Sequence, residues 1–204
     1  LILCLGLSQG FFMSLQFTGY NTIAYDEIDQ DRMGSASTFY TTFQQLMLSM
    51  GICAGAAALQ AWLLQRAVAA ALVADVGPVS LWCAGDPAHP AFALCRAFGA
   101  VSLRQQGAGD LGARMLQALQ ESAAPGGTLL VGTDCPALTP GLLRQAANAL
   151  TGHDAVAIPA EDGGYVLLGA HRPAPELFAD VQWGSARVMA QTRERLRALG
   201  WSWS

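Results

Sequence analysis

The stretch Leu129-Leu130-Val131-Gly132-Thr133-Asp134-Cys135-Pro136 decides the fold of the second part of this chain. Apolar residues lead into a glycine and a threonine and then into a carboxylate, and the proline stops the strand two residues later. A short apolar run of this kind predicts a buried parallel strand, and open α/β sheets bind their ligands at the carboxyl ends of such strands. Since hard cations prefer oxygen ligands, Asp134 at that edge suits a divalent metal, Mg²⁺ or Mn²⁺, with a diphosphate.

A second acidic signal follows in Glu161-Asp162-Gly163-Gly164-Tyr165, which again borders an apolar run. The two segments together are the strongest indication of function in the sequence, because both place carboxylates beside an apolar run. Structural alternatives stay open for both. Asp134 also suits a turn or helix cap ahead of Pro136, and the acidic pair followed by two glycines also suits a plain tight turn.

Helices and short apolar strands alternate along this part of the chain. Asp110 suits the cap of one helix, and Thr139-Pro140 suits the start of the next. This alternation predicts an α/β fold, with a mostly parallel sheet covered by helices on both faces. The expected strands are 79–84, 100–103, 128–132, 154–158 and 165–169, and the expected helices are 66–74, 90–98, 111–121, 140–150 and 185–199.

The first part of the chain has a different composition. No charged residue occurs in Leu1–Tyr25 or in Gly34–Gln65, and the polar loop Asp26–Arg32 separates these two runs. Because roughly 20 apolar residues cross a bilayer, we expect residues 1–65 to form an all-α apolar hairpin of two transmembrane helices. A buried soluble hairpin is the alternative. Residues 66–204 are then expected to form a separate domain.

Charge and cysteine content limit the function and the location. The 204 residues carry 11 basic and 15 acidic side chains, with no lysine and no basic run, which argues against nucleic-acid binding. The five cysteines lack zinc spacing and suggest reduced thiols. Together with the apolar hairpin, this predicts that the protein lies in the inner (cytoplasmic) membrane, with residues 66–204 in the cytoplasm. A wholly cytoplasmic protein is expected if the first segment is an artefact.

A literal G-x-G-x-x-G motif occurs in Gly107-Ala108-Gly109-Asp110-Leu111-Gly112, ahead of a predicted helix. A dinucleotide site also needs a hydrophobic strand directly before the motif, and Ser102–Gln106 supplies a poor one. A dinucleotide-binding protein is therefore the weaker alternative. The loop is interpreted instead as a glycine-rich turn in which Asp110 caps the helix, or as a wall of a nucleotide pocket.

Residues 1–65 resemble two late helices of a drug:proton antiporter of the major facilitator superfamily. The resemblance rests on Gln9–Thr18, Asn21-Thr22, Ser35-Ala36-Ser37 and Gln44-Gln45-Leu46. It implies a membrane fragment of a multidrug efflux transporter. Two helices provide no substrate path, because such transporters need about a dozen spans.

Residues 66–200 resemble the bacterial glycosyltransferases of the nucleotide-diphospho-sugar transferase type, formerly a domain of unknown function. The motifs are Gln105–Met115, Gly132–Pro136, Pro159–Tyr165 and Trp183, in the family's order. The resemblance implies a GT-A-like (Rossmann-like) fold, a nucleotide-activated sugar as substrate and a divalent metal. It also implies Asp134 as the metal-facing acid, Asp162 and Glu161 as catalytic residues, and substrate contacts by Gly109, Asp110, Gly112, Gly163, Gly164 and Tyr165.

The chain departs from this family at both ends. Members begin with a strand and a loop rich in Pro, Gly and Lys or Arg that handles phosphates, and they continue to a further strand and helix. We expect both elements to be missing, which predicts a partial, truncated domain with open sheet edges and impaired activity.

Overall fold

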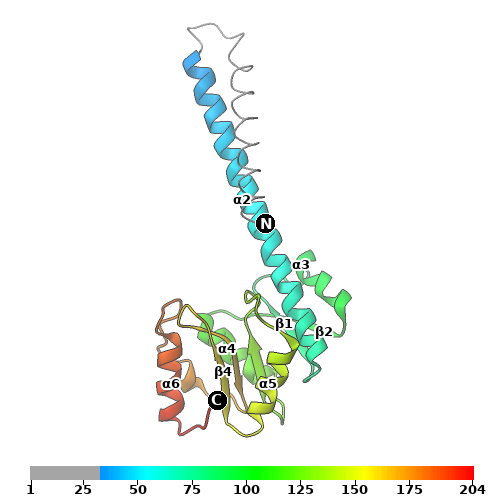
Figure 1. Cartoon of the computed structure of the whole chain (residues 1–204), viewed down its shortest axis with the longest axis vertical. Helices are drawn as coiled ribbons and strands as arrows, with labels where there is room; N and C mark the ends of the chain where they lie inside the picture. Colours follow the sequence, from blue (N-terminus) through cyan, green and yellow to red (C-terminus); the bar gives the residue numbers. More distant parts are fainter. Residues whose placement is uncertain (1–32) are drawn as a thin grey trace, which may run out of the picture. The chain divides into compact units, whose positions relative to one another are not determined.

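The computed structural model describes residues 33–204 (Figure 1). The run Leu1–Tyr25, the loop after it and most of the transporter-like motifs lie outside these residues, so the apolar hairpin stays a prediction. The elements are α2 (Met33–Ala74), β1 (Val79–Cys83), α3 (Pro90–Ala93), the 3₁₀ helix η2 (Leu94–Phe98), β2 (Val101–Gln105), α4 (Leu111–Glu121), β3 (Thr128–Val131), α5 (Pro140–Leu150), β4 (Ala155–Pro159), β5 (Tyr165–Ala170), the 3₁₀ helix η3 (Pro175–Leu177) and α6 (Val188–Ala198).

Helix α2 is continuous from Met33 to Ala74 and passes through the expected domain boundary at Gln65-Arg66. The chain divides elsewhere, into the compact units Leu1–Ala57 and Ala58–Ser204. The last turns of the helix belong to the core of the second unit, where Ala67, Val68, Ala70 and Ala74 are buried. The predicted division into a hairpin of residues 1–65 and a domain of residues 66–204 stays a prediction.

Five strands form two sheets within residues 33–204. Strands β1 and β2 pair in parallel, from Val79 with Val101 to Cys83 with Gln105. The second sheet has the order β3-β5-β4, and both outer strands are antiparallel to β5. The predicted α/β class is correct, but β5 is not parallel to its neighbours as the sequence suggested. The reason is the short turn 160–164 between β4 and β5, since a parallel return needs a crossover of a dozen or more residues.

Helices cover both faces of the β3-β5-β4 sheet (Figure 1). Leu167 and Leu168 of β5 are both fully buried, and successive strand residues point to opposite faces. Leu167 packs in a cluster with α2 and α5, whereas Leu168 packs in a second cluster with α4, η3 and α6. A third cluster, around Leu81, Cys83 and Cys95, joins α2 to the β1-β2 pair. Helix α2 thus contributes to the packing of both sheets.

The outer edge of β4 is covered by the segment Ser202–Ser204. Ala155 N donates to Ser202 O (3.1 Å), and Ala157 N donates to Ser204 O (3.0 Å). Asp154 fixes this segment, because its Oδ2 accepts hydrogen bonds from the Ser202 backbone N (2.9 Å) and from Ser202 Oγ (2.8 Å). By contrast, β1, β2 and β3 each keep one edge without a strand partner among the described residues.

We expect the stabilising effect of the Asp154 carboxylate to disappear in acid. The hydrogen bonds from the Ser202 backbone N–H and hydroxyl hold the pKa of Asp154 below its ordinary value of 3.8. A depressed folded-state pKa contributes stability that is present above pH 3.8 and is lost as the pH falls through the folded-state value. Asp154→Asn should therefore have a lower urea midpoint than the wild type at pH 7, and the difference should close below pH 3.8. A difference that stays constant across this range would contradict the assignment.

Candidate functional site

The two acidic segments lie at the same edge of the β3-β5-β4 sheet. Val131 of β3 and Ile158 of β4 both pair with Leu167, from opposite sides of β5. With neighbouring strands about 4.8 Å apart, these two positions are separated by about 10 Å. Asp134 follows Val131 by three residues, and Glu161 follows Ile158 by three residues. The strand ends therefore bring both acids to the carboxyl ends of β3 and β4.

Asp134 is exposed, and its carboxylate folds back over Gly132. The Gly132 N donates to Val166 O (2.9 Å), which fixes the chain where β3 ends. A Cβ on Gly132 would lie 3.0 Å from Asp134 Oδ1. The glycine thus leaves room for this carboxylate beside the strand end. The loop then turns through a Leu138 N to Cys135 O hydrogen bond (3.3 Å) before α5 begins.

The turn 160–164 holds the other acids. It closes through Ala160 N to Gly164 O (3.0 Å), and Asp162 Oδ1 accepts a hydrogen bond from Gly164 N (2.9 Å). One oxygen of Asp162 therefore stabilises the turn. Glu161 is exposed, and no described residue hydrogen-bonds to its carboxylate. Of the two acids, Glu161 is therefore the one whose carboxylate is not used within the turn.

Gly163 is pressed against a later segment of the chain. Its φ is +86°, and a Cβ there would lie 2.6 Å from Ala186 Cα. Met189 N at the start of α6 donates to Gly163 O (2.8 Å). The segment Trp183–Met189, here called the clamp segment, thereby fixes the position of the acidic turn.

The clamp segment also contacts the start of α4. A Cβ on Gly112 would lie 2.8 Å from the Trp183 ring, and Trp183 stacks on Phe178 with ring centroids 6.5 Å apart. The Trp183 Nε1 is buried and has no hydrogen-bond partner among the described residues. One segment therefore contacts both the glycine-rich loop and the acidic turn. The sequence identified Trp183 only as a family motif, and no local pattern predicts these long-range contacts.

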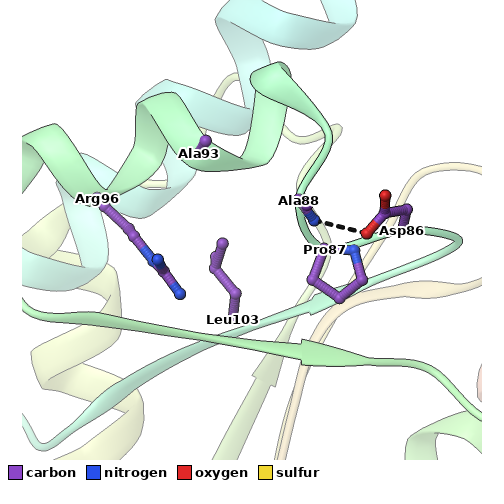
Figure 2. A pocket seen from close by; sticks show the side chains of 6 residues that line it. All are labelled: Asp86, Pro87, Ala88, Ala93, Arg96 and Leu103. Atoms are coloured by element: carbon purple, nitrogen blue, oxygen red, sulfur yellow. Dashed lines mark hydrogen bonds between the residues drawn. The ribbon is translucent and has the colours of Figure 1, made fainter.

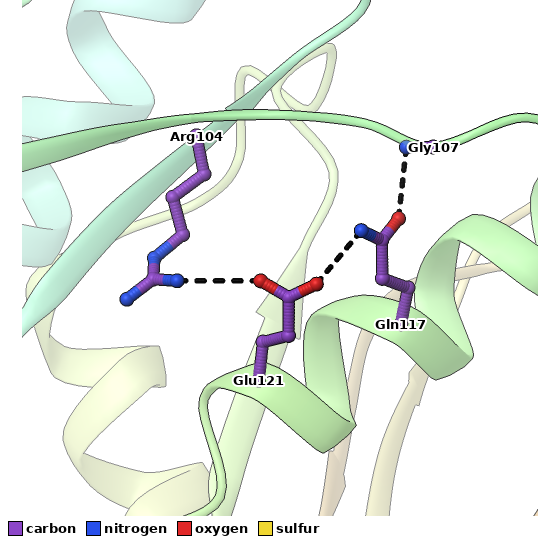
Figure 3. A network of polar contacts seen from close by, with 4 residues as sticks. All are labelled: Arg104, Gly107, Gln117 and Glu121. Atoms are coloured by element: carbon purple, nitrogen blue, oxygen red, sulfur yellow. Dashed lines mark hydrogen bonds and ion pairs between the residues drawn. The ribbon is translucent and has the colours of Figure 1, made fainter.

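The glycine-rich loop before α4 is held by side chains of α4 itself (Figure 3). Gly107 N donates to Gln117 Oε1 (2.8 Å), and Gln117 Nε2 donates to Glu121 Oε1 (2.8 Å). Glu121 also pairs with Arg104 of β2 (3.3 Å). Gly109 has φ +108°, a conformation that side chains other than glycine rarely adopt.

The strand β2 lies directly before this loop, but it is not the hydrophobic strand that a dinucleotide site needs, as the sequence predicted. It is an exposed strand, with Ser102, Arg104 and Gln105 at the surface. As predicted, Asp110 caps α4, and its Oδ1 accepts from Ala113 N (2.9 Å). A carboxylate thus occupies the helix N-terminus that a dinucleotide pyrophosphate would need, which disfavours the dinucleotide alternative. Substrate contacts by Gly109, Asp110 and Gly112 stay predictions.

Tyr165 lies beside the core. Its ring packs in the cluster of Leu168 and Trp183, and its hydroxyl lies 3.8 Å from Met115 Sδ. Burial raises the pKa of Tyr165, so this phenol stays protonated at neutral pH. Its predicted contact with substrate, like those of Gly163 and Gly164, stays a prediction.

A separate cavity of about 510 Å³ lies beyond the carboxyl end of β1 (Figure 2). Asp86 Oδ1 accepts from Ala88 N at its rim (2.8 Å), and the Arg96 side chain extends toward Leu103. None of the site residues expected from the sequence lines it. Its lining residues are Asp86, Pro87, Ala88, Ala93, Arg96 and Leu103.

The described residues contain no cluster of three His, Cys, Asp or Glu side chains that could enclose a metal ion. The donors at the sheet edge still fit a cation that arrives with its substrate. Mg²⁺ keeps several waters and is usually bound through one or two carboxylates together with substrate phosphates. The exposed Asp134 offers one such carboxylate.

A family model described as "Uncharacterized protein conserved in bacteria (DUF2064)" matches residues 64–185, more than half of the chain. The chain belongs to this family. The DUF2064 match begins within α2 and includes Asp134, the acidic turn and Trp183. The predicted match of residues 66–200 to a bacterial family formerly listed as a domain of unknown function is thereby confirmed, whereas no comparison supports the transporter resemblance.

The chain is also similar to a solved structure from Desulfovibrio desulfuricans G20, described as a "putative nucleotide-diphospho-sugar transferase". The two are 28% identical with a TM-score of 0.58, and the match covers 70% of this chain. This chain spans 65% of the length of that protein. No curated protein matches this chain.

Proposed function

We propose that the part of the chain after residue 66 is a metal-dependent transferase of the nucleotide-diphospho-sugar type. The observation that carries the proposal is the placement of Asp134 and Glu161 at one sheet edge, three residues beyond strand positions that face each other across β5. The similarity to a nucleotide-diphospho-sugar transferase structure, at 28% identity, supports the same class of reaction.

In this proposal each acid has a separate role. Asp134 would hold Mg²⁺ or Mn²⁺ beside the diphosphate, where a cation would supply positive charge to the leaving group. Glu161 accepts the proton of the acceptor hydroxyl. The hydroxyl oxygen forms a bond to the anomeric carbon while the bond from that carbon to the diphosphate oxygen breaks, so the nucleoside diphosphate leaves. Asp162 keeps the turn closed and thereby orients Glu161.

The glycines of the site have a steric role in this proposal. Gly132 leaves space for the Asp134 carboxylate, and Gly163 permits the contact with Ala186 that fixes the turn. The clamp segment then sets the distance between the acidic turn and the loop before α4. A transporter function has no comparable support, since the described residues contain one helix that is long and apolar enough to cross a membrane.

Calorimetric titration of the full chain tests the proposal. The full chain, kept in detergent micelles, is titrated with nucleotide-diphospho-sugars that differ in base and in sugar. We expect heat of binding from at least one of them when Mn²⁺ or Mg²⁺ is present, and much less heat with EDTA. Binding that is equal in EDTA would exclude the role of the cation. Absence of heat with every member of the panel would contradict the proposal.

A further inference from the structure

Helix α2 carries an exposed apolar surface over residues 45–62. Every side chain described between Gln45 and Gln60 is exposed, including Ile52 at 71% and Met50 at 59%. No charged residue occurs from Gly34 to Gln65. Soluble proteins rarely leave a contiguous apolar surface of this extent in water, so this surface needs a partner.

The distribution of the side chains around the helix identifies the kind of partner. Leu46, Met50, Ile52, Leu59 and Trp62 occupy several sides of the helix and do not form one stripe. A second copy of the helix, or another protein groove, covers one stripe and leaves the other sides in water. A helix that is apolar all round suits the hydrocarbon of a lipid bilayer, which contacts every side.

The length and the end of the run agree with a bilayer. Twenty helical residues, 43–62, span about 30 Å, which is the thickness of the hydrocarbon layer. Arg66 then lies over the Trp62 ring, with its guanidinium carbon 5.6 Å from the ring centroid. Tryptophan and arginine side chains are typical of the boundary between lipid and water. Immediately after this pair, Ala67 and Val68 are buried in the core of the second unit.

We infer that residues 43–62 of α2 cross a lipid bilayer, and that Trp62 and Arg66 mark the boundary where the helix leaves it. The boundary at Trp62 and Arg66 is one end of the span, and Ala67–Ala74 of the same helix then belong to the water-soluble core. The span shares no residue with the sheet edge to which the transferase function is assigned.

Synthesis of the full chain in a cell-free system with phosphatidylcholine–phosphatidylglycerol vesicles tests the inference. The wild type should float with the vesicles and stay with them in carbonate at pH about 11. Ile52→Arg places a charge at the centre of the span. It should reduce the fraction of protein that stays with the vesicles in carbonate on the order of tenfold. Gln60→Arg, the matched control, places the same charge near the boundary, where it reaches the headgroups, and should float like the wild type.

Three outcomes would overturn the inference. These are release of the wild type by carbonate, a water-soluble oligomer that forms without vesicles, and equal flotation of the two arginine variants. A measurement of depth covers the case in which Ile52→Arg accumulates poorly. Lipids brominated near the headgroup should quench the tryptophan fluorescence of the wild type more than lipids brominated near the bilayer centre. Trp62→Phe should remove this difference. Quenching that is independent of bromine depth would likewise overturn it.

Discussion

The Asp134→Asn variant is expected to lose metal-dependent binding of a nucleotide-diphospho-sugar by roughly 100-fold, since groups in metal sites typically contribute factors of 10–100 or more. Asparagine has the same size as aspartate, and the exposed side chain over Gly132 makes no hydrogen bond to a described residue, so the fold should not change. What disappears is the negative charge that attracts the cation beside the diphosphate. Titration of wild type and variant with the same sugar nucleotide and Mn²⁺ measures the loss.

The matched control for this experiment is Asp86→Asn. Asp86 is also an exposed acid beyond the carboxyl end of a strand, but it follows β1 and contributes to the separate cavity. Its replacement removes the same formal charge and should change sugar-nucleotide binding by less than about twofold, because exposed charges are screened by salt. Equal losses in the two variants would mean that Asp134 acts only through net charge. An unchanged affinity in Asp134→Asn would remove it from the metal site.

The elements that the sequence predicted most accurately are those with strong local signals. Helices α4 and α5 have the expected bounds, 111–121 and 140–150, because Asp110 and Thr139 accept hydrogen bonds from the first turns. The strands β1, β3 and β4 also agree to within a residue or two. Each is a short apolar run that ends at a turn, a pattern that needs no long-range information.

The direction of β5 was missed, although its signal was present. An apolar run gives no strand direction, whereas the length of the preceding connection does. Residues 160–164 are too few for a crossover, so β5 had to return antiparallel to β4. The predicted position of Asp134, at the edge where the strands have their carboxyl ends, does not depend on the direction of β5. Strands β3 and β4 are both antiparallel to β5 and therefore end on the same side of the sheet.

The contacts of the clamp segment were beyond sequence reasoning. Gly112 and Trp183 are 71 residues apart, and Gly163 and Ala186 are 23 apart, by the residue numbers. Glycines at 112 and 163 suggested close approach of a ligand, yet in the structure it is protein atoms that approach them. A missing Cβ indicates that something lies close to the backbone, but not what it is.

For this reason Gly163→Ala is expected to be among the most destabilising single substitutions in the second unit, at about 3 kcal/mol or more. Positive φ costs a residue with a Cβ about 1 kcal/mol, and the added methyl would overlap the Ala186 backbone, which cannot rotate away as a side chain could. The displacement should also break the Met189 N to Gly163 O hydrogen bond at the start of α6. Urea unfolding followed by tryptophan fluorescence measures the change.

Gly184→Ala separates the two contributions to this loss. Gly184 lies in the clamp segment and has φ +75°, but no atom lies within 4 Å of a Cβ placed there. It carries the backbone strain without the overlap, so it should cost only about 1 kcal/mol. Equal destabilisation by the two alanines would show that Ala186 moves freely and that the clamp segment does not fix the acidic turn. A large difference, with sugar-nucleotide binding lost only in Gly163→Ala, would mean that binding depends on how firmly this segment holds Glu161 and Asp162 at the sheet edge.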